Sequence, residues 1–200
     1  MRLIRVLIIF IGVIGIVVIL ALIIGYYLYS LSPRIEERII PVAVSANDAQ
    51  NFDEKLDSLK TQAKEASETG EKEEISLVIT EKEVNSKLVQ LLAEGELPLK
   101  KILINFGDGY FLISAVMDAP GADAKTGAIG RIEISKGKPK VALAEFNLGK
   151  LPLPESVKIK VEQLLNMMLN LQVADFPVEI SDVQIKNHQI AVTGTTKVIK

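Results

Sequence analysis

The sequence contains one long, uncharged and mostly aliphatic stretch, Val6–Pro33, which constrains the fold more than any other feature. At about 1.5 Å per helical residue, this stretch is longer than the roughly 30 Å hydrocarbon core of a bilayer. Tyr26, Tyr27 and Tyr29 cluster near its end, where amphipathic rings favour the headgroup level. The stretch therefore predicts a single transmembrane helix that tethers everything after it.

Charges beside this stretch predict its orientation. Arg2 and Arg5 precede it without acidic neighbours, whereas the arginines of Arg34–Arg38 are matched by glutamates. Together with the N-terminal amine, this asymmetry places the N-terminus in the cytoplasm and the C-terminal part outside the cytoplasmic membrane. The alternative is a cleaved signal peptide with its site at Val44-Ser45-Ala46. Against it, the apolar core of a signal peptide usually spans only about 7–15 residues.

The composition narrows the chemistry that the chain can perform. It has no cysteine and one histidine, His188, which falls in a predicted hairpin turn. No phosphate-binding glycine loop and no G-x-S-x-G motif occurs. We therefore expect no catalysis, no cofactor and no metal ion. Because the basic residues are not clustered, nucleic acid is not an expected partner. A hydrolase with paired carboxylates far apart in sequence stays open, but the sequence nominates no pair.

After the apolar stretch, the pattern predicts a charged amphipathic helix from about residue 48 to 69, ended by Gly70. Its apolar positions form a narrow stripe: Phe52, Leu56, Leu59, Ala63 and Ala66. Such a stripe fits either a seam that pairs with a partner protein or a helix packed lightly on its own domain. We divide the chain into a cytoplasmic tip with the transmembrane helix (1–33), a linker with this helix (34–74) and an ectodomain (75–200).

The ectodomain pattern predicts one α+β domain. A short strand leads into the capping box Thr80-Glu81-Lys82-Glu83, which opens a helix. The apolar period then changes from 3.6 to 2. Turn residues separate three hairpins, with strands at 102–106 and 110–117, at 129–134 and 141–148, and at 178–185 and 189–197; a loop is predicted at 120–127 and a helix at 155–171. We therefore expect one antiparallel sheet of about six strands.

Two of these elements are more apolar than a sheet with one wet face requires. The strand Tyr110–Met117 is apolar on both sides, and the helix Glu155–Leu171 carries apolar residues outside its main stripe. A helix that is apolar around most of its circumference is either wrapped by the fold or lines an apolar cavity. If the second reading holds, the residues expected to line an apolar ligand site are Phe111, Ile113, Phe146, Ile159, Met167 and Met168.

The most distinctive stretch is Leu148-Gly149-Lys150-Leu151-Pro152-Leu153-Pro154, a strand end, a glycine break and a proline-stiffened connector to a helix. This segment, with the N-terminal span and the capping box, resembles the YpmS-like family of membrane-anchored bacterial proteins over about residues 75–200. The architecture of that family looks similar to tubular lipid-binding domains. The resemblance implies a curved sheet wrapped around a long helix, with an apolar groove and no catalytic residues.

Two functions follow as expectations. The first is a membrane-tethered domain that binds membrane lipid or another amphiphile in an apolar groove without catalysis. The second is a non-catalytic cell-envelope scaffold that binds a partner protein through the 48–69 helix. An apolar groove of several hundred Å³ would favour the first, because ordinary protein cores contain no voids of that size.

Overall fold

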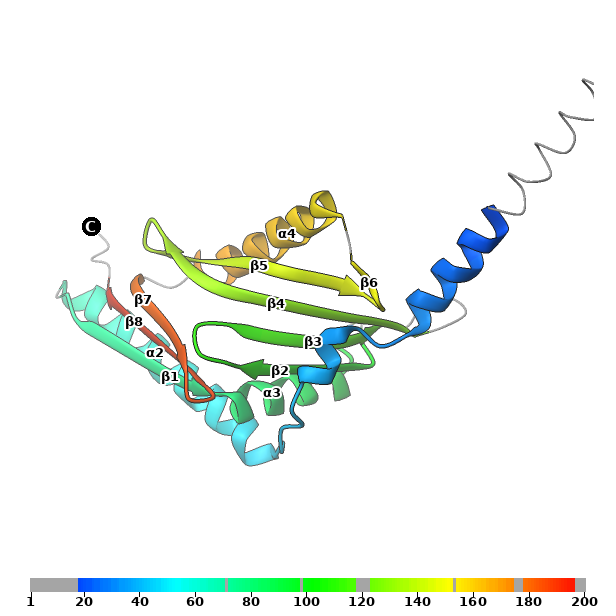
Figure 1. Ribbon diagram of the computed structural model, residues 1–200. Helices are drawn as coiled ribbons and strands as arrows, with labels where there is room; N and C mark the ends of the chain where they lie inside the picture. Colours follow the sequence, from blue (N-terminus) through cyan, green and yellow to red (C-terminus); the bar gives the residue numbers. More distant parts are fainter. Residues whose placement is uncertain are drawn as a thin grey trace, which may run out of the picture.

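A computed structural model describes residues 18–70, 72–97, 99–117, 123–152, 154–174 and 178–196; for residues 152, 164 and 168–174 it describes the backbone alone. Within these residues the chain is an α+β protein with two antiparallel sheets. Figure 1 shows the sheets and their helices forming one body, from one end of which an apolar helix projects.

The projecting helix covers residues 18–30 and is followed by a 3-10 turn, η1 (Arg34–Arg38). Its apolar side chains are exposed, and those of Leu22 and Tyr27 are more than half accessible. The segment Val18–Arg38 is long and apolar enough to cross a membrane, a property that signal sequences also have. A helix that is apolar all round requires an apolar environment. The rest of the predicted span, with Arg2 and Arg5, lies outside the described residues.

The strands form two separate sheets. The smaller sheet has the order β1-β8-β7, and the larger has the order β2-β3-β4-β5-β6, with antiparallel pairing throughout. The bounds are β1 (Glu74–Thr80), β2 (Lys101–Phe106), β3 (Phe111–Met117), β4 (Ala124–Ser135), β5 (Lys138–Leu148), β6 (Leu151–Pro152), β7 (Val178–Lys186) and β8 (Gln189–Thr196). The three predicted hairpins are all present.

The expected single sheet of about six strands, wrapped around a long helix, is wrong. The C-terminal hairpin β7–β8 pairs with β1 instead of extending the larger sheet. The physical reason lies at the two edges of the larger sheet, because helix side chains already occupy their backbone groups. At one edge, the side chains of Glu162 and Asn166 bond the backbone of β5; at the other, Glu81 and Asn85 bond the backbone of β2. No strand can pair where these side chains lie.

The three helices that cover the sheets lie close to the predicted positions. They are α2 (Ala46–Thr69), α3 (Glu81–Ala93) and α4 (Glu155–Ala174). Gly70 ends α2 in the left-handed conformation, as predicted. The helix begins earlier than the predicted residue 48, because the Ser45 side chain caps it. The predicted capping box of α3 is confirmed, with the Thr80 and Glu83 side chains bonding each other's backbone N–H groups.

The predicted loop at 120–127 is wrong in its second half, because β4 begins at Ala124; residues 118–122 lie outside the described residues. The small side chains that indicated a loop serve a different purpose. A Cβ atom built on Gly127 would lie 3.0 Å from the Ile35 Cβ and 3.1 Å from the Pro33 Cβ. The strand therefore needs a glycine here, because the segment that leaves the apolar helix packs directly on it.

Candidate ligand-binding site

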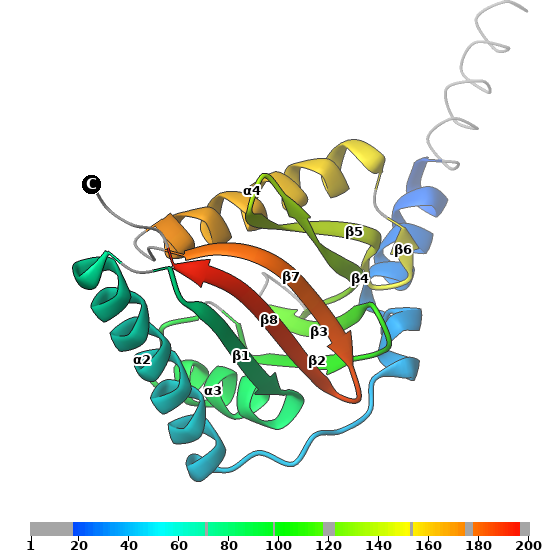
Figure 2. The same cartoon turned by 90° about the vertical axis from the view of Figure 1, so that its left-hand side faces the viewer.

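The structure contains an apolar cavity of about 740 Å³ between α2, α3 and the inner face of the β1-β8-β7 sheet. Figure 2 shows α2 running beside β1, with α3 behind the sheet. The lining is almost entirely aliphatic: Phe52, Leu56 and Leu59 from α2; Val84, Leu88 and Leu91 from α3; Ile75, Leu77, Val178, Ile180, Val183, Ile190 and Val192 from the sheet; and Ile132 and Pro139 from the larger sheet. Close-packed cores leave no void of this size, whereas ligand pockets are of this size.

The local sequence explains why α2 stands away from the sheet along much of its length. Near its C-terminal end the stripe narrows to alanine, and Ala63 is fully buried against Ile75 and Val178. At the other end, the Ser45 backbone N–H donates to the Ser86 hydroxyl oxygen at 3.1 Å. Between these two attachments the stripe consists of a phenylalanine and two leucines, all half-buried. The larger side chains hold the middle of α2 above the cavity.

Few polar groups reach this cavity. Lys60, Lys87 and Thr193 contribute to the lining, and both lysines pair with aspartates of α2. The Lys87 ammonium lies 2.7 Å from the Asp53 carboxylate. Among the described residues, the lining includes no histidine and no carboxylate. The site can therefore hold an apolar chain by burial.

A polar groove lies next to the cavity, between α2 and β1. Its volume is about 490 Å³, and its lining shares Leu59 and Leu77 with the cavity. In this groove, the Lys55 ammonium donates to the Val78 carbonyl oxygen at 2.9 Å and lies 2.7 Å from the buried Glu83 carboxylate. Lys55 thus ties α2 to both β1 and α3.

This ion pair changes the titration of Glu83. Burial would raise the pKa of the carboxyl group, but the hydrogen bonds from the Lys55 side chain and the Thr80 backbone, with the Lys55 charge, hold the pKa below its ordinary value. Folding thus favours the ionised form. Such a group stabilises the fold above its unfolded-state pKa, and this contribution is lost as the pH falls through the lower folded-state pKa.

We therefore expect the unfolding free energy to fall with pH below about 4.5, partly through Glu83. Replacing Lys55 with methionine should lower stability at pH 7 and flatten this acid dependence, as measured by urea unfolding of the full chain in micelles from pH 3 to 7. Lys60→Met is the control, because the Lys60–Asp57 pair is exposed and screened by solvent. An equally steep acid dependence in Lys55→Met would contradict the assignment.

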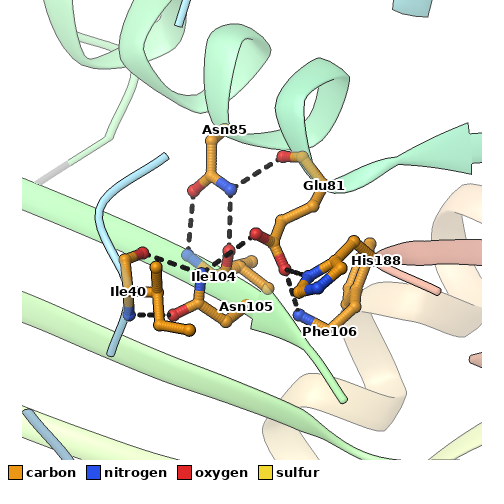
Figure 3. Close-up of polar contacts among 7 residues, drawn as sticks. All are labelled: Ile40, Glu81, Asn85, Ile104, Asn105, Phe106 and His188. Atoms are coloured by element: carbon orange, nitrogen blue, oxygen red, sulfur yellow. Dashed lines mark hydrogen bonds and ion pairs between the residues drawn. The ribbon is translucent and has the colours of Figure 1, made fainter. Parts of the chain in front are cut away.

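A second cluster, of buried polar groups, lies where α3 meets β2 (Figure 3). The Asn85 amide accepts from the Ile104 N–H at 2.8 Å and donates to the Ile104 carbonyl oxygen at 2.7 Å. The Glu81 carboxylate accepts from the Phe106 N–H at 2.5 Å and lies 3.3 Å from His188 Nδ1. The backbone N–H of Glu81 donates to the His188 carbonyl oxygen. Nearly every hydrogen bond in this cluster has a backbone group as one partner, so the cluster fixes α3 on the sheet edge.

The only histidine of the sequence, His188, contacts this cluster. His188 lies in the β7–β8 turn with a positive φ, as does Asn187, in agreement with the predicted hairpin turn. Among the residues that the structure describes, no group of three histidine or acidic side chains is placed to hold a metal ion.

Of the six residues predicted to line a ligand site, the five whose side chains the structure describes lie elsewhere. Phe111, Ile113 and Phe146 belong to a core cluster into which α4 also packs, so the structure does bring this strand and helix together. Ile159 and Met167 are 43% and 55% exposed on the outside of α4. The side chain of Met168 lies outside the described residues. None of the other five lines the 740 Å³ cavity, and no observation tests whether the six contact a ligand.

The helix residues that line the cavity form two apolar stripes in the sequence, and both stripes contain leucines. One lies in the 48–69 helix and the other in the helix that follows it. Periodicity shows which face of a helix is apolar, but not what that face meets. The unrecognised signal was the size contrast within the first stripe, with large residues followed by Ala63 and Ala66. The chain matches no protein-family model, and no curated protein matches it. The resemblance to the YpmS-like family therefore stays a prediction.

Proposed function

We propose that this protein is a membrane-tethered, extracytoplasmic domain that binds the apolar chain of a lipid or similar amphiphile without catalysis. The observation that carries the proposal is the 740 Å³ aliphatic cavity under α2. The exposed apolar helix at the N-terminal side supplies the tether. In this proposal Arg2 and Arg5 stay in the cytoplasm, and the tether is not removed after Ala46.

The cavity favours an uncharged, flexible occupant. Its walls are the side chains of leucine, isoleucine and valine, which make no directional bonds and gain about 25 cal/mol per Å² of apolar surface removed from water. The two lysines of the described lining already pair with aspartates, so they do not require a charged ligand group. An acyl chain therefore fits this lining better than a sugar, a nucleotide or a peptide backbone, each of which needs polar partners.

The scaffold alternative receives less support. The stripe that would form a partner seam faces the chain's own cavity and sheet, and its Ala63 and Ala66 are fully covered by the chain itself. Phe52, Leu56 and Leu59 are half-buried on the cavity side of α2, so they offer a partner little apolar surface. The remaining faces of α2 are charged, which is typical of a solvated surface.

Because the chain has no tryptophan, one introduced indole can report on the cavity. Leu91→Trp places it in the lining, and Val89→Trp places it on the exposed side of the same helix. In the full chain in nanodiscs, a fatty acid brominated at mid-chain should quench Leu91→Trp saturably, and the unbrominated acid should compete. Val89→Trp should keep its fluorescence, because α3 lies away from the apolar helix (Figure 1).

A second reporter, Leu56→Trp, views the cavity from the α2 wall. It keeps the experiment decisive if Leu91→Trp folds poorly. Saturable quenching of either lining reporter, with none for Val89→Trp, supports the proposal. If no lining reporter is quenched, or if all three are quenched alike, amphiphile binding in this cavity is refuted.

A further inference from the structure

The base of the apolar helix is fixed to the larger sheet by backbone contacts. The Lys150 N–H donates to the Leu28 carbonyl oxygen at 2.9 Å, and the Gly149 N–H donates to the Lys125 carbonyl oxygen at 2.8 Å. The first bond uses one of the carbonyl groups that every helix end leaves unpaired. The second joins the β5–β6 turn to β4 and so fixes the position of Gly149. The first residues of the distinctive segment Leu148–Pro154 therefore contact the end of the apolar helix.

The chain that leaves the helix is held as well. The Lys125 ammonium donates to the Ser32 hydroxyl oxygen at 2.8 Å. Ile35 is only 1% exposed, because its side chain packs against the larger sheet at Gly127. The close approach to Gly127 leaves no space between this segment and β4. These attachments, to the helix end and to the chain that follows it, fix the direction in which the helix leaves the domain.

The start of α4 lies on the side of the domain from which the apolar helix leaves. Lys150 is followed at once by β6 and then by α4, which begins at Glu155. Figures 1 and 2 both show β6 and the first turns of α4 on the side of the apolar helix, and the start of α4 reaches as high as that helix. The remainder of α4 runs away from the helix base.

The first turns of α4 combine exposed apolar side chains with lysines. Val157 and Ile159 are 36% and 43% exposed, although aliphatic residues are usually covered. Lys160, in the same turns, and Lys150, which precedes β6, are exposed as well. Apolar side chains that reach the acyl boundary, with lysines whose ammonium groups reach the headgroups, are typical of segments that lie in a membrane interface.

We propose that the first turns of α4, residues 155–160, rest in the headgroup layer of the bilayer that the apolar helix crosses. Val157 and Ile159 then enter the acyl boundary, and Lys150 and Lys160 face lipid phosphates. This contact, together with the fixed helix base, holds the domain in one orientation on the membrane. The proposal rests on the apolar helix crossing a bilayer, but not on occupancy of the cavity.

The test uses full-chain Ile159→Trp in nanodiscs of phosphatidylcholine with brominated or unbrominated acyl chains. We expect the brominated lipid to quench this tryptophan and the emission to lie at shorter wavelength than for an indole in water. Met167→Trp is the matched control, since Met167 is exposed on the same helix, about 12 Å further along. Its fluorescence should be the same in both lipids.

Val157→Trp provides a second reporter from the same turns and guards against a local effect of one substitution. If Ile159→Trp and Val157→Trp both emit as in water and are not quenched, the membrane contact is refuted. Equal quenching of Met167→Trp would also refute it, because the contact would not be confined to the first turns. The brominated fatty acid and the α3 reporters test the cavity separately, so either proposal can fail alone.

Discussion

Replacing Asn85 with alanine should lower the free energy of unfolding by about 2–4 kcal/mol, since each buried backbone group left without a partner costs about 1–3 kcal/mol. Asn85 is 1% exposed and bonds both the N–H and the carbonyl oxygen of Ile104. Alanine removes both bonds. The measurement is urea unfolding of the full chain in micelles, followed by circular dichroism.

The chain carries its own control for this substitution. At the opposite sheet edge, Asn166 bonds the N–H of Val141 at 2.7 Å and its carbonyl oxygen at 2.8 Å, and Glu162 bonds the N–H of Leu143. Asn166 is only partly buried, so water can replace its bonds more easily. Asn166→Ala should therefore cost clearly less. An equal or larger loss for Asn166→Ala would show that burial does not set the cost.

The two edges use the same arrangement. On α3 and on α4, a glutamate and an asparagine four residues later bond alternate residues of the neighbouring edge strand, and each asparagine also donates to the glutamate's own carbonyl. Four-residue spacing places both side chains on one helix face. An exposed strand edge is a template for unwanted pairing. Because helix side chains occupy both edges, the larger sheet gains no further long strand, and the C-terminal hairpin pairs with β1 instead.

This arrangement explains how far the sequence could predict the fold. Caps, hairpin turns and strand positions depend on neighbouring residues, so the capping box at Thr80 and the turn at Asn187-His188 were predictable. Which hairpin joins which sheet depends on groups far apart in the chain, such as Asn85 with Ile104 and Asn166 with Val141. No periodicity reports such a bond, and the single six-stranded sheet was the simplest arrangement without it.

The candidate site was harder to predict for a similar reason. The stripe of the 48–69 helix and the apolar face of α3 can be seen in the sequence. Whether a cavity forms between them depends on the distances between the elements, and sequence patterns do not give these distances. The apolar residues of α4 outside its main stripe were assigned to a ligand site. The structure leaves Ile159 on the surface in the first turns of α4, where contact with a bilayer would account for its exposure as well as a ligand would.

The second large effect is expected at Gly149, which joins the larger sheet to the apolar helix. Its φ is +58°, and a Cβ atom there would lie 2.4 Å from the Tyr29 carbonyl oxygen and 2.6 Å from that of Leu28. Alanine in this conformation costs about 1–2 kcal/mol. The contact with two backbone oxygens adds to this, because neither can rotate away as a flexible side chain would. We expect Gly149→Ala to separate the helix base from the sheet.

Two measurements on the full chain in nanodiscs report that separation. Hydrogen exchange at the Lys150 amide should accelerate, because its bond to the Leu28 carbonyl oxygen is lost. Quenching of Ile159→Trp by brominated lipid should fall in the same background, since α4 is no longer held against the bilayer. Gly95→Ala is the control: Gly95 has a similar φ of +75° but open space around its Cβ position. It carries the same backbone strain without the collision, so it should change neither readout. If Gly149→Ala also leaves both unchanged, the helix base is not what orients the domain on the membrane.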